Sequence, residues 1–152
     1  EAILEGVLAG FPTTGIKATL YDGSYHPVDS SEMAFKIAAH LAFKKGAMAA
    51  KPVLLEPIMS VEVRVPENNM GDIISDFNTK RGRVLGTESE GKYTIVKATC
   101  PLSEMYRYAI DLKSMTQGRG SFTMEFNGYE EVPARLAEEI IKKTKAEAEA
   151  EK

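Results

Sequence analysis

Several features that many proteins carry are scarce in this sequence. It has one cysteine, Cys100, and no tryptophan. A single cysteine excludes an internal disulfide framework and any zinc site built from several cysteines, and it is typical of a reducing compartment. The sequence lacks the run of about 18 apolar residues that a membrane-spanning helix needs. It has neither a starting methionine nor the charged-then-apolar pattern of a secretion signal, so we expect a piece of a longer cytoplasmic protein.

Charge and histidine content narrow the function classes further. The 152 residues carry 19 Lys and Arg against 22 Asp and Glu, a formal net charge of −3. A free-standing nucleic-acid-binding protein is usually basic, so any contact with nucleic acid must be local. The stretch from residue 77 to residue 87 is one such place, because it holds Lys80, Arg81 and Arg83 and no acidic residue. The two histidines, His26 and His40, do not form a metal pair, and we expect no metal site.

The first part of the chain predicts short elements that look incomplete. Residues 2–9 read as the end of a helix with Gly10 as its stop, too short to be stable alone. Residues 16–21 alternate and carry β-formers, which predicts a strand. Asp22 and Gly23 then open a loop.

A long helix and a domain boundary follow that loop. Asp29 with Glu32 three residues later indicates a helix start, and the helix is expected to run to about residue 50. Apolar residues fall on two of its faces, which predicts burial on two sides. Pro52 and Pro57 bracket a short connection, so we expect one domain over residues 1–57 and a second over residues 58–152.

After residue 57 the pattern predicts an α+β domain of the ferredoxin-like type, with the order β-α-β-β-α-β and a helix behind it. The alternating Val61, Val63 and Val65 indicate a half-buried strand that ends at Pro66. The second helix is expected to open at Pro101, with Leu102, Met105, Tyr106, Ala109 and Leu112 facing inward. The other elements are expected at residues 67–81 (helix), 83–88 and 92–99 (hairpin strands), 121–127 (strand) and 134–152 (helix).

Two sets of residues imitate catalytic motifs without their context. Gly86 to Lys92 matches the first seven positions of a phosphate-binding loop, but Tyr93 replaces the magnesium-ligating hydroxyl and a strand follows instead of a helix. We interpret it as a hairpin turn. Ser24, His26, Asp29 and Ser30 crowd one loop with no nucleophile elbow and no visible oxyanion hole, so we expect no catalytic residue.

Two basic, glycine-containing connections are candidates for phosphate contacts. The first is Lys80-Arg81-Gly82-Arg83, and the second is the loop of residues 113–121, which includes Gln117 and Arg119. Both lead from a helix to a strand, and we expect both at the same end of the sheet. Basic side chains and glycines allow a close approach to phosphates. Ordinary helix C-capping explains the same residues equally well, and both interpretations stay open.

Long stretches of the sequence resemble bacterial-type elongation factor G, the translocation GTPase. They are LYDGSYHPVDSSEMAFKIAAHLAFKKGAMAAKPVLLEPIMSVEV, TKRGRVLG and LKSMTQGRGSFTMEFNGYEEVP. The resemblance covers nearly the whole chain. It implies that residues 1–57 are the C-terminal half of an α/β fourth domain and that the rest is a ferredoxin-like fifth domain. Pro27 after the histidine and the Ala/Glu-rich tail depart from the family pattern.

The resemblance also implies partners and contact residues. The fourth domain's tip enters the decoding region beside the tRNA–mRNA duplex, and the tip loop is Asp22, Gly23, Ser24, Tyr25 and His26. The fifth domain contacts large-subunit rRNA, with Lys80, Arg81, Arg83, Gln117 and Arg119 as candidates. The expected partners are thus both ribosomal subunits, with no DNA and no membrane. GTP and Mg²⁺ would bind in a GTPase domain outside this sequence, so the chain itself needs no cofactor.

Two other functions are open at this stage. Another translational GTPase, of the ribosomal-protection or release-factor type, would share this architecture but replace the tip loop. A small ferredoxin-like hydrolase such as an acylphosphatase would need an Arg/Asn pair in a phosphate-cradling loop after the first strand. Pro66-Glu67 stands there instead.

Overall fold

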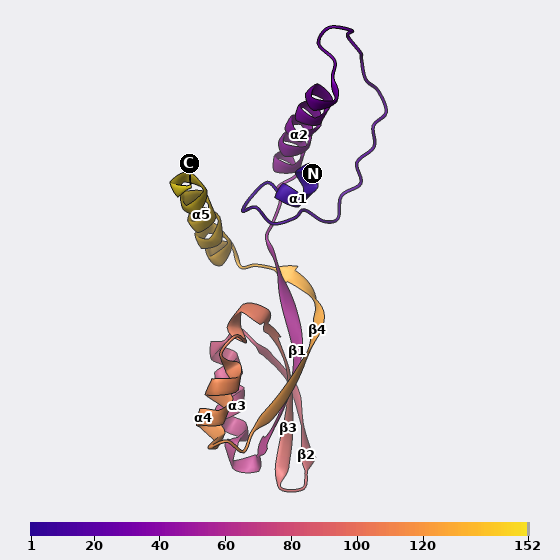
Figure 1. Cartoon of the computed structure of the whole chain (residues 1–152). Coiled ribbons are helices and arrows are strands. Elements are labelled where there is room, and N and C mark those ends of the chain that lie inside the picture. The colour runs from indigo at the N-terminus through magenta and orange to yellow at the C-terminus, as the bar shows by residue number, and fades with distance from the viewer. Residues whose placement is uncertain (152) are drawn as a thin grey trace. The chain divides into compact units, whose positions relative to one another are not determined.

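The computed structural model describes residues 1–151 and divides into two compact units (Figure 1). Unit 1 combines Glu1–Leu54 with Val132–Lys152, and unit 2 is Leu55–Glu131. The sequence predicted a single division after residue 57. Whether the units coincide with the fourth and fifth domains of the family stays a prediction.

Unit 2 is a four-stranded antiparallel sheet with two helices on one face (Figure 1). The strands lie in the order β2-β3-β1-β4, so the first strand is central and the last forms an edge. This arrangement confirms the predicted ferredoxin-like order. The elements are β1 (Leu55–Pro66), α3 (Met70–Thr79), β2 (Arg83–Glu90), β3 (Tyr93–Pro101), α4 (Tyr108–Thr116) and β4 (Ser121–Glu131), with 3₁₀ turns at Glu67–Asn69 and Leu102–Glu104.

Alternation along the two central strands builds the core. Val61, Val63 and Val65 on β1 are at most 1% exposed, as the sequence predicted. In the register, Val63 lies opposite Val96 of β3, so both strands send their small apolar residues to the same face. β1 is longer than predicted, because it begins at Leu55 inside the segment that the two prolines suggested was a connection.

The two helices cover that face with aromatic and aliphatic side chains. Phe77 of α3 and Tyr108 of α4 are fully buried, with their ring centroids 5.5 Å apart. Tyr108 also meets Phe122 of β4 edge-on at 5.0 Å. Such ring contacts stabilise the core beyond what burial of the ring surface alone contributes.

The inward face of α4 differs from the prediction. Met105 and Leu112 are buried as expected, but Tyr106 is 80% exposed, Ala109 is exposed, and Tyr108 takes the inward place. The reason is a change of period, because residues 102–104 form a 3₁₀ turn and the α-helix begins only at Tyr108. A 3₁₀ turn repeats every 3.0 residues, so it shifts every later position relative to a continuous α-helix.

Unit 1 contains three helices and no strand among its described residues. They are α1 (Ala2–Glu5), α2 (Glu32–Ala49) and α5 (Ala134–Ala150). Its buried cluster consists of Ala9, Leu54 and Val132, with Leu136 and Ile141 of α5 packed against them. The C-terminal helix was predicted, but its membership of the same compact unit as the N-terminal segment was not.

Three expectations for unit 1 are wrong in detail. The first helix ends at Glu5, where Gly6 adopts a φ of 66°, and not near Gly10. Residues 16–21 form no strand, because none of the strands β1–β4 pairs with them. Ser31, not Asp29, caps α2, because its hydroxyl accepts a hydrogen bond from the Ala34 N–H at 3.1 Å.

The burial predicted for both faces of α2 is also not observed. None of its residues is buried, and Phe35 and Leu41 are 51% and 65% exposed. An apolar helix face is buried only if a second layer covers it, and the described residues of unit 1 supply none here. Across residues 1–151, no helix combines the length and the apolar character that crossing a membrane requires.

Candidate nucleic-acid interface

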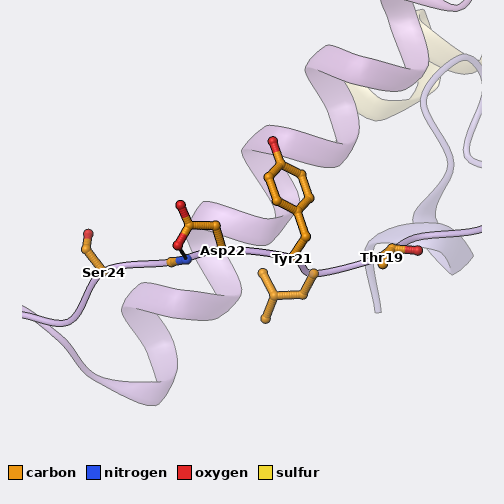
Figure 2. A pocket seen from close by; sticks show the side chains of 6 residues that line it. Thr19, Tyr21, Asp22 and Ser24 are labelled. Carbon is orange, nitrogen blue, oxygen red and sulfur yellow. Dashed lines mark hydrogen bonds between the residues drawn. The ribbon is translucent and has the colours of Figure 1, made fainter.

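The first candidate surface is the segment that leads to α2. The chain from Thr19 to Ser24 is extended and lines an open hollow of about 400 Å³. Tyr21 and Asp22 project from the same side of this extended chain (Figure 2). The Asp22 carboxylate accepts a hydrogen bond from the Gly23 N–H at 2.7 Å, which folds the acid onto its own backbone. The predicted tip residues Asp22–His26 are all exposed.

His26 is held in this loop through one ring nitrogen. Its Nδ1 lies 3.2 Å from the Asp29 carboxylate and 3.4 Å from the Val28 nitrogen. Its backbone N–H donates to the Ser30 hydroxyl at 2.7 Å, and its carbonyl accepts from the Ser30 N–H at 2.9 Å. Residues 26–30 thus form a small turn that leads to the cap of α2. This anchoring leaves Nε2 and the ring faces available to a ligand.

Arg81 is an internal ion-pair centre in this structure. Its two terminal nitrogens donate to the two carboxylate oxygens of Glu56 at 2.7 and 3.0 Å, and its Nε donates to Glu104 at 3.0 Å. A fourth bond, to the Ser103 hydroxyl, measures 3.3 Å. The hydrogen bond to Glu56 is the main reason that the pKa of Arg81 is raised, so the guanidinium stays charged. The group joins the start of β1 to the turns that follow α3 and β3.

Lys80 has a similar role between the two helices. Its ammonium lies 2.8 Å from Asp76 and 3.2 Å from Asp111. Burial alone would lower the pKa of Lys80, but the hydrogen bonds to these two carboxylates outweigh it and raise the pKa. Each cation of the Lys80-Arg81 pair therefore faces two carboxylates, and the pair has little positive potential to offer a phosphate.

Gln117 and Arg119 lie in a hydrogen-bonded loop, and Arg119 forms no ion pair with another described residue. Gln117 adopts a left-handed φ of 53° and ends α4, and Gly118 donates to the Lys113 carbonyl at 2.8 Å. Arg119 donates from Nε to the Thr116 carbonyl at 3.2 Å, which orients the guanidinium, and no other residue between 1 and 151 binds its two terminal nitrogens. A Cβ at Gly120 would come within 2.9 Å of the Thr116 hydroxyl, so only glycine fits this close turn.

The two basic connections lie at opposite ends of the sheet, and the expectation that they share one end is wrong. β1 and β2 both pair antiparallel with β3 and so run in the same direction, whereas β4 runs antiparallel to β1. The start of β2, at Arg83, therefore lies at the end of the sheet where β1 begins. The start of β4, at Ser121, lies opposite Arg64 near the end of β1. Arg83 is exposed and no ion pair among the described residues involves it.

The residues that imitate a nucleotide site do not form one. Residues 86–90 are part of β2, Gly91 turns with a φ of 64°, and β3 begins at Tyr93. Two carboxylates, Glu88 and Glu90, are engaged with Lys97 and Arg64 across the sheet. No group of three or more metal-binding side chains occurs in the part of the chain that the structure describes.

Comparison with known proteins identifies the family. The family model described as the C-terminus of elongation factor G matches residues 53–140, and that of elongation factor G domain IV matches residues 1–51. The chain belongs to the elongation factor G family. A Thermus thermophilus protein of known crystal structure is 50% identical to it, with a TM-score of 0.83 over 95% of this chain. The match covers 22% of that protein, so this chain spans about a fifth of its length.

These matches assign the chain to the C-terminal part of elongation factor G. The alternative of a free-standing ferredoxin-like hydrolase is rejected by this finding. The sequence did not reveal the four carboxylates that engage Lys80 and Arg81. Asp76 stands four residues before Lys80, a helical spacing that could have signalled its pair. Glu56, Glu104 and Asp111 gave no local signal, because only the folded sheet brings them to these cations.

Proposed function

We propose that this chain is the ribosome-contacting, non-catalytic part of a cytoplasmic GTPase that drives tRNA–mRNA translocation. The GTPase domain would lie elsewhere in the longer factor and bind GTP with Mg²⁺. Membership of the elongation factor G family supports the proposal, and the observation that carries it is the exposed loop Asp22–His26 ahead of a capped helix. Loops on a rigid support are where contacts with partners concentrate.

In this proposal the tip loop meets the tRNA–mRNA duplex in the decoding region. Tyr25 is 71% exposed, and His26 presents a ring that is fixed at one nitrogen. Aromatic and imidazole rings stack on bases and riboses, and the free ring nitrogen can bond a 2′-hydroxyl. No covalent bond changes at this end of the factor, so His26 acts as a contact and not as a general base.

The rRNA contacts of unit 2 are assigned to Arg83, Gln117 and Arg119. Arg119 supports this best, because its guanidinium is pre-oriented and its terminal nitrogens are free for a phosphate. Lys80 and Arg81 are given a structural role instead, since both are engaged by carboxylates. Contact with both ribosomal subunits follows if the tip loop and these residues bind at the same time.

Replacement of His26 by alanine in the full-length factor tests the proposal. We expect slower mRNA movement in stopped-flow translocation with near-normal single-round GTP hydrolysis, because the proposal places the GTPase domain outside this chain. The melting temperature should barely change, since exposed substitutions usually stay within about 0.5 kcal/mol. His40→Ala, on α2 outside the loop, is the matched control and should leave translocation unchanged. An unaltered translocation rate in His26→Ala, or hydrolysis that falls in parallel, would reject the contact role.

A further inference from the structure

Among the described strands, β4 is an edge strand whose outer side has no strand partner. It is last in the order β2-β3-β1-β4, and its residues Ser121–Glu131 pair only with β1. About half of the backbone N–H and C=O groups of such a strand point away from the sheet and can pair with another chain. A Cβ at Gly128 would meet nothing within 4 Å, so the backbone there is open to an approaching segment.

An exposed apolar patch follows this edge. Phe126 and Tyr129 are 58% and 63% exposed, and their rings meet edge to face with centroids 5.3 Å apart. Met124 is 40% exposed beside them. In the register, Phe126 lies opposite Met59 and Met124 lies opposite Val61. Phe126 and Met124 are therefore on the same face of the sheet as the core, but the helices leave both side chains exposed. An apolar cluster on a free edge marks an interaction surface more strongly than a scattered apolar residue does.

The acidic side chains along β4 favour a partner of positive charge. Glu125, Glu130 and Glu131 take part in none of the ion pairs among the described residues. Three free carboxylates repel RNA, and they also repel the same strand of a second copy, where the acids would meet each other. A positively charged polypeptide is the complementary occupant.

We propose that the β4 edge binds an extended, Lys/Arg-rich protein segment as a fifth strand of the sheet. The outward backbone groups of β4 pair with the segment, as in other cases of strand addition. Phe126 and Tyr129 cover the aliphatic stems of cations on one face of the sheet, and Glu125 and Glu130 bind the charged ends of cations on the other face. This proposal rests on the proposed function, which makes the partner a basic protein of the ribosome.

A photo-cross-linking experiment with purified ribosomes tests this surface. The photoreactive residue p-benzoylphenylalanine replaces Phe126 in the full-length factor, and the control carries it at Thr123, on the other face of the same strand. Co-sedimentation measures ribosome binding separately. We expect a cross-link from position 126 to a Lys/Arg-rich segment of a ribosomal protein, identified by mass spectrometry, and a much weaker one from position 123.

A charge-reversal variant provides a second measurement. Glu125→Lys with Glu130→Lys should reduce the cross-link yield about fivefold, whereas Glu138→Lys, an exposed acid on α5 and not part of β4, should not. A factor that sediments with ribosomes but cross-links to rRNA, to itself, to a second copy or to nothing would overturn the β4 proposal alone. Failure to sediment would reject the proposed function and this proposal together.

Discussion

Two phenylalanines on two helices show how differently the units are built. Phe77 on α3 is fully buried, whereas Phe35 on α2 is 51% exposed. Each belongs to an apolar helix face, so sequence pattern alone does not distinguish them. The sheet of unit 2 covers the face of α3, and the described residues of unit 1 offer no such layer to α2. A helix pattern therefore predicts the helix, while burial depends on a second element.

The strongest test of this comparison is amide hydrogen exchange along the whole chain. We expect the central amides of β1 and β3 to exchange on the order of 10³-fold more slowly than those of residues 1–54, since the core of unit 2 opens only on global unfolding. A separately expressed piece of residues 55–131 should keep the slow pattern, because its sheet and core are complete. Equally slow exchange throughout residues 1–54 in a dilute monomer would contradict the comparison.

Alanine substitution at Phe77 and Phe35 compares the packing of the two units directly. Phe77→Ala should cost about 3–5 kcal/mol, because it removes a fully buried ring and leaves a cavity. Phe35→Ala should stay within about 0.5 kcal/mol, since a half-exposed ring loses little burial. Free energies from native-state exchange in each unit would measure both. Similar costs at the two positions would mean that α2 is packed in solution.

The sequence was a good guide wherever contacts are local or periodic. The valine alternation of β1, the hairpin at Gly91 and the helix α3 were all predicted and are confirmed. It failed where a single local change displaced the pattern, as the 3₁₀ turn before Tyr108 did. It also failed for residues 16–21, because their alternation suits a strand but no partner strand is present among the described residues.

In the candidate site too, the sequence predicted the local features and not the contacts between distant residues. The tip loop could be found from its sequence, since turn residues and a helix cap are local features. The roles of Lys80 and Arg81 could not, because three of the four carboxylates that engage them come from β1, a 3₁₀ turn and α4. The most distant in sequence is Asp111, 31 positions from Lys80. Arg81 and Arg119 look alike in sequence and differ only in what the fold brings to them.

A comparison of Arg81 and Arg119 separates a structural cation from a binding one. Arg81→Met should lower the free energy of unfolding by about 1–3 kcal/mol, because it leaves the carboxylates of Glu56 and Glu104 without their hydrogen-bond donor. Arg119→Met should leave stability within about 0.5 kcal/mol. In ribosome binding by the full-length factor, Arg119→Met should reduce the salt slope by about 0.7–0.9 for each phosphate that the guanidinium neutralises. Urea unfolding and co-sedimentation at several salt concentrations measure the two effects, and an unchanged slope would leave Arg119 as a helix cap only.

The smallest expected effect is on the reactivity of the one cysteine. Burial raises the pKa of the Cys100 thiol to about 11 from an ordinary 9.0, and its Sγ donates to the Lys80 carbonyl at 3.4 Å. At pH 8 the thiolate fraction is then about 100-fold lower than that of an exposed cysteine, and only the thiolate reacts. We expect iodoacetamide to label native Cys100 at least that much more slowly than the tip-loop cysteine of a Ser24→Cys, Cys100→Ala variant.

The same shift gives a pH dependence with a definite sign. The folded pKa of Cys100 is raised, so the protonated thiol favours the folded chain. Its contribution to stability is complete below pH 9.0, where the unfolded thiol is also protonated, and is lost as the pH rises toward about 11. Urea unfolding of the chain and of Cys100→Ala between pH 8 and pH 11 measures it. Equal loss of stability in both proteins over this range would contradict the raised pKa of Cys100. Equal labelling rates for Cys100 and the tip-loop cysteine would mean that the interior of unit 2 is accessible to solvent.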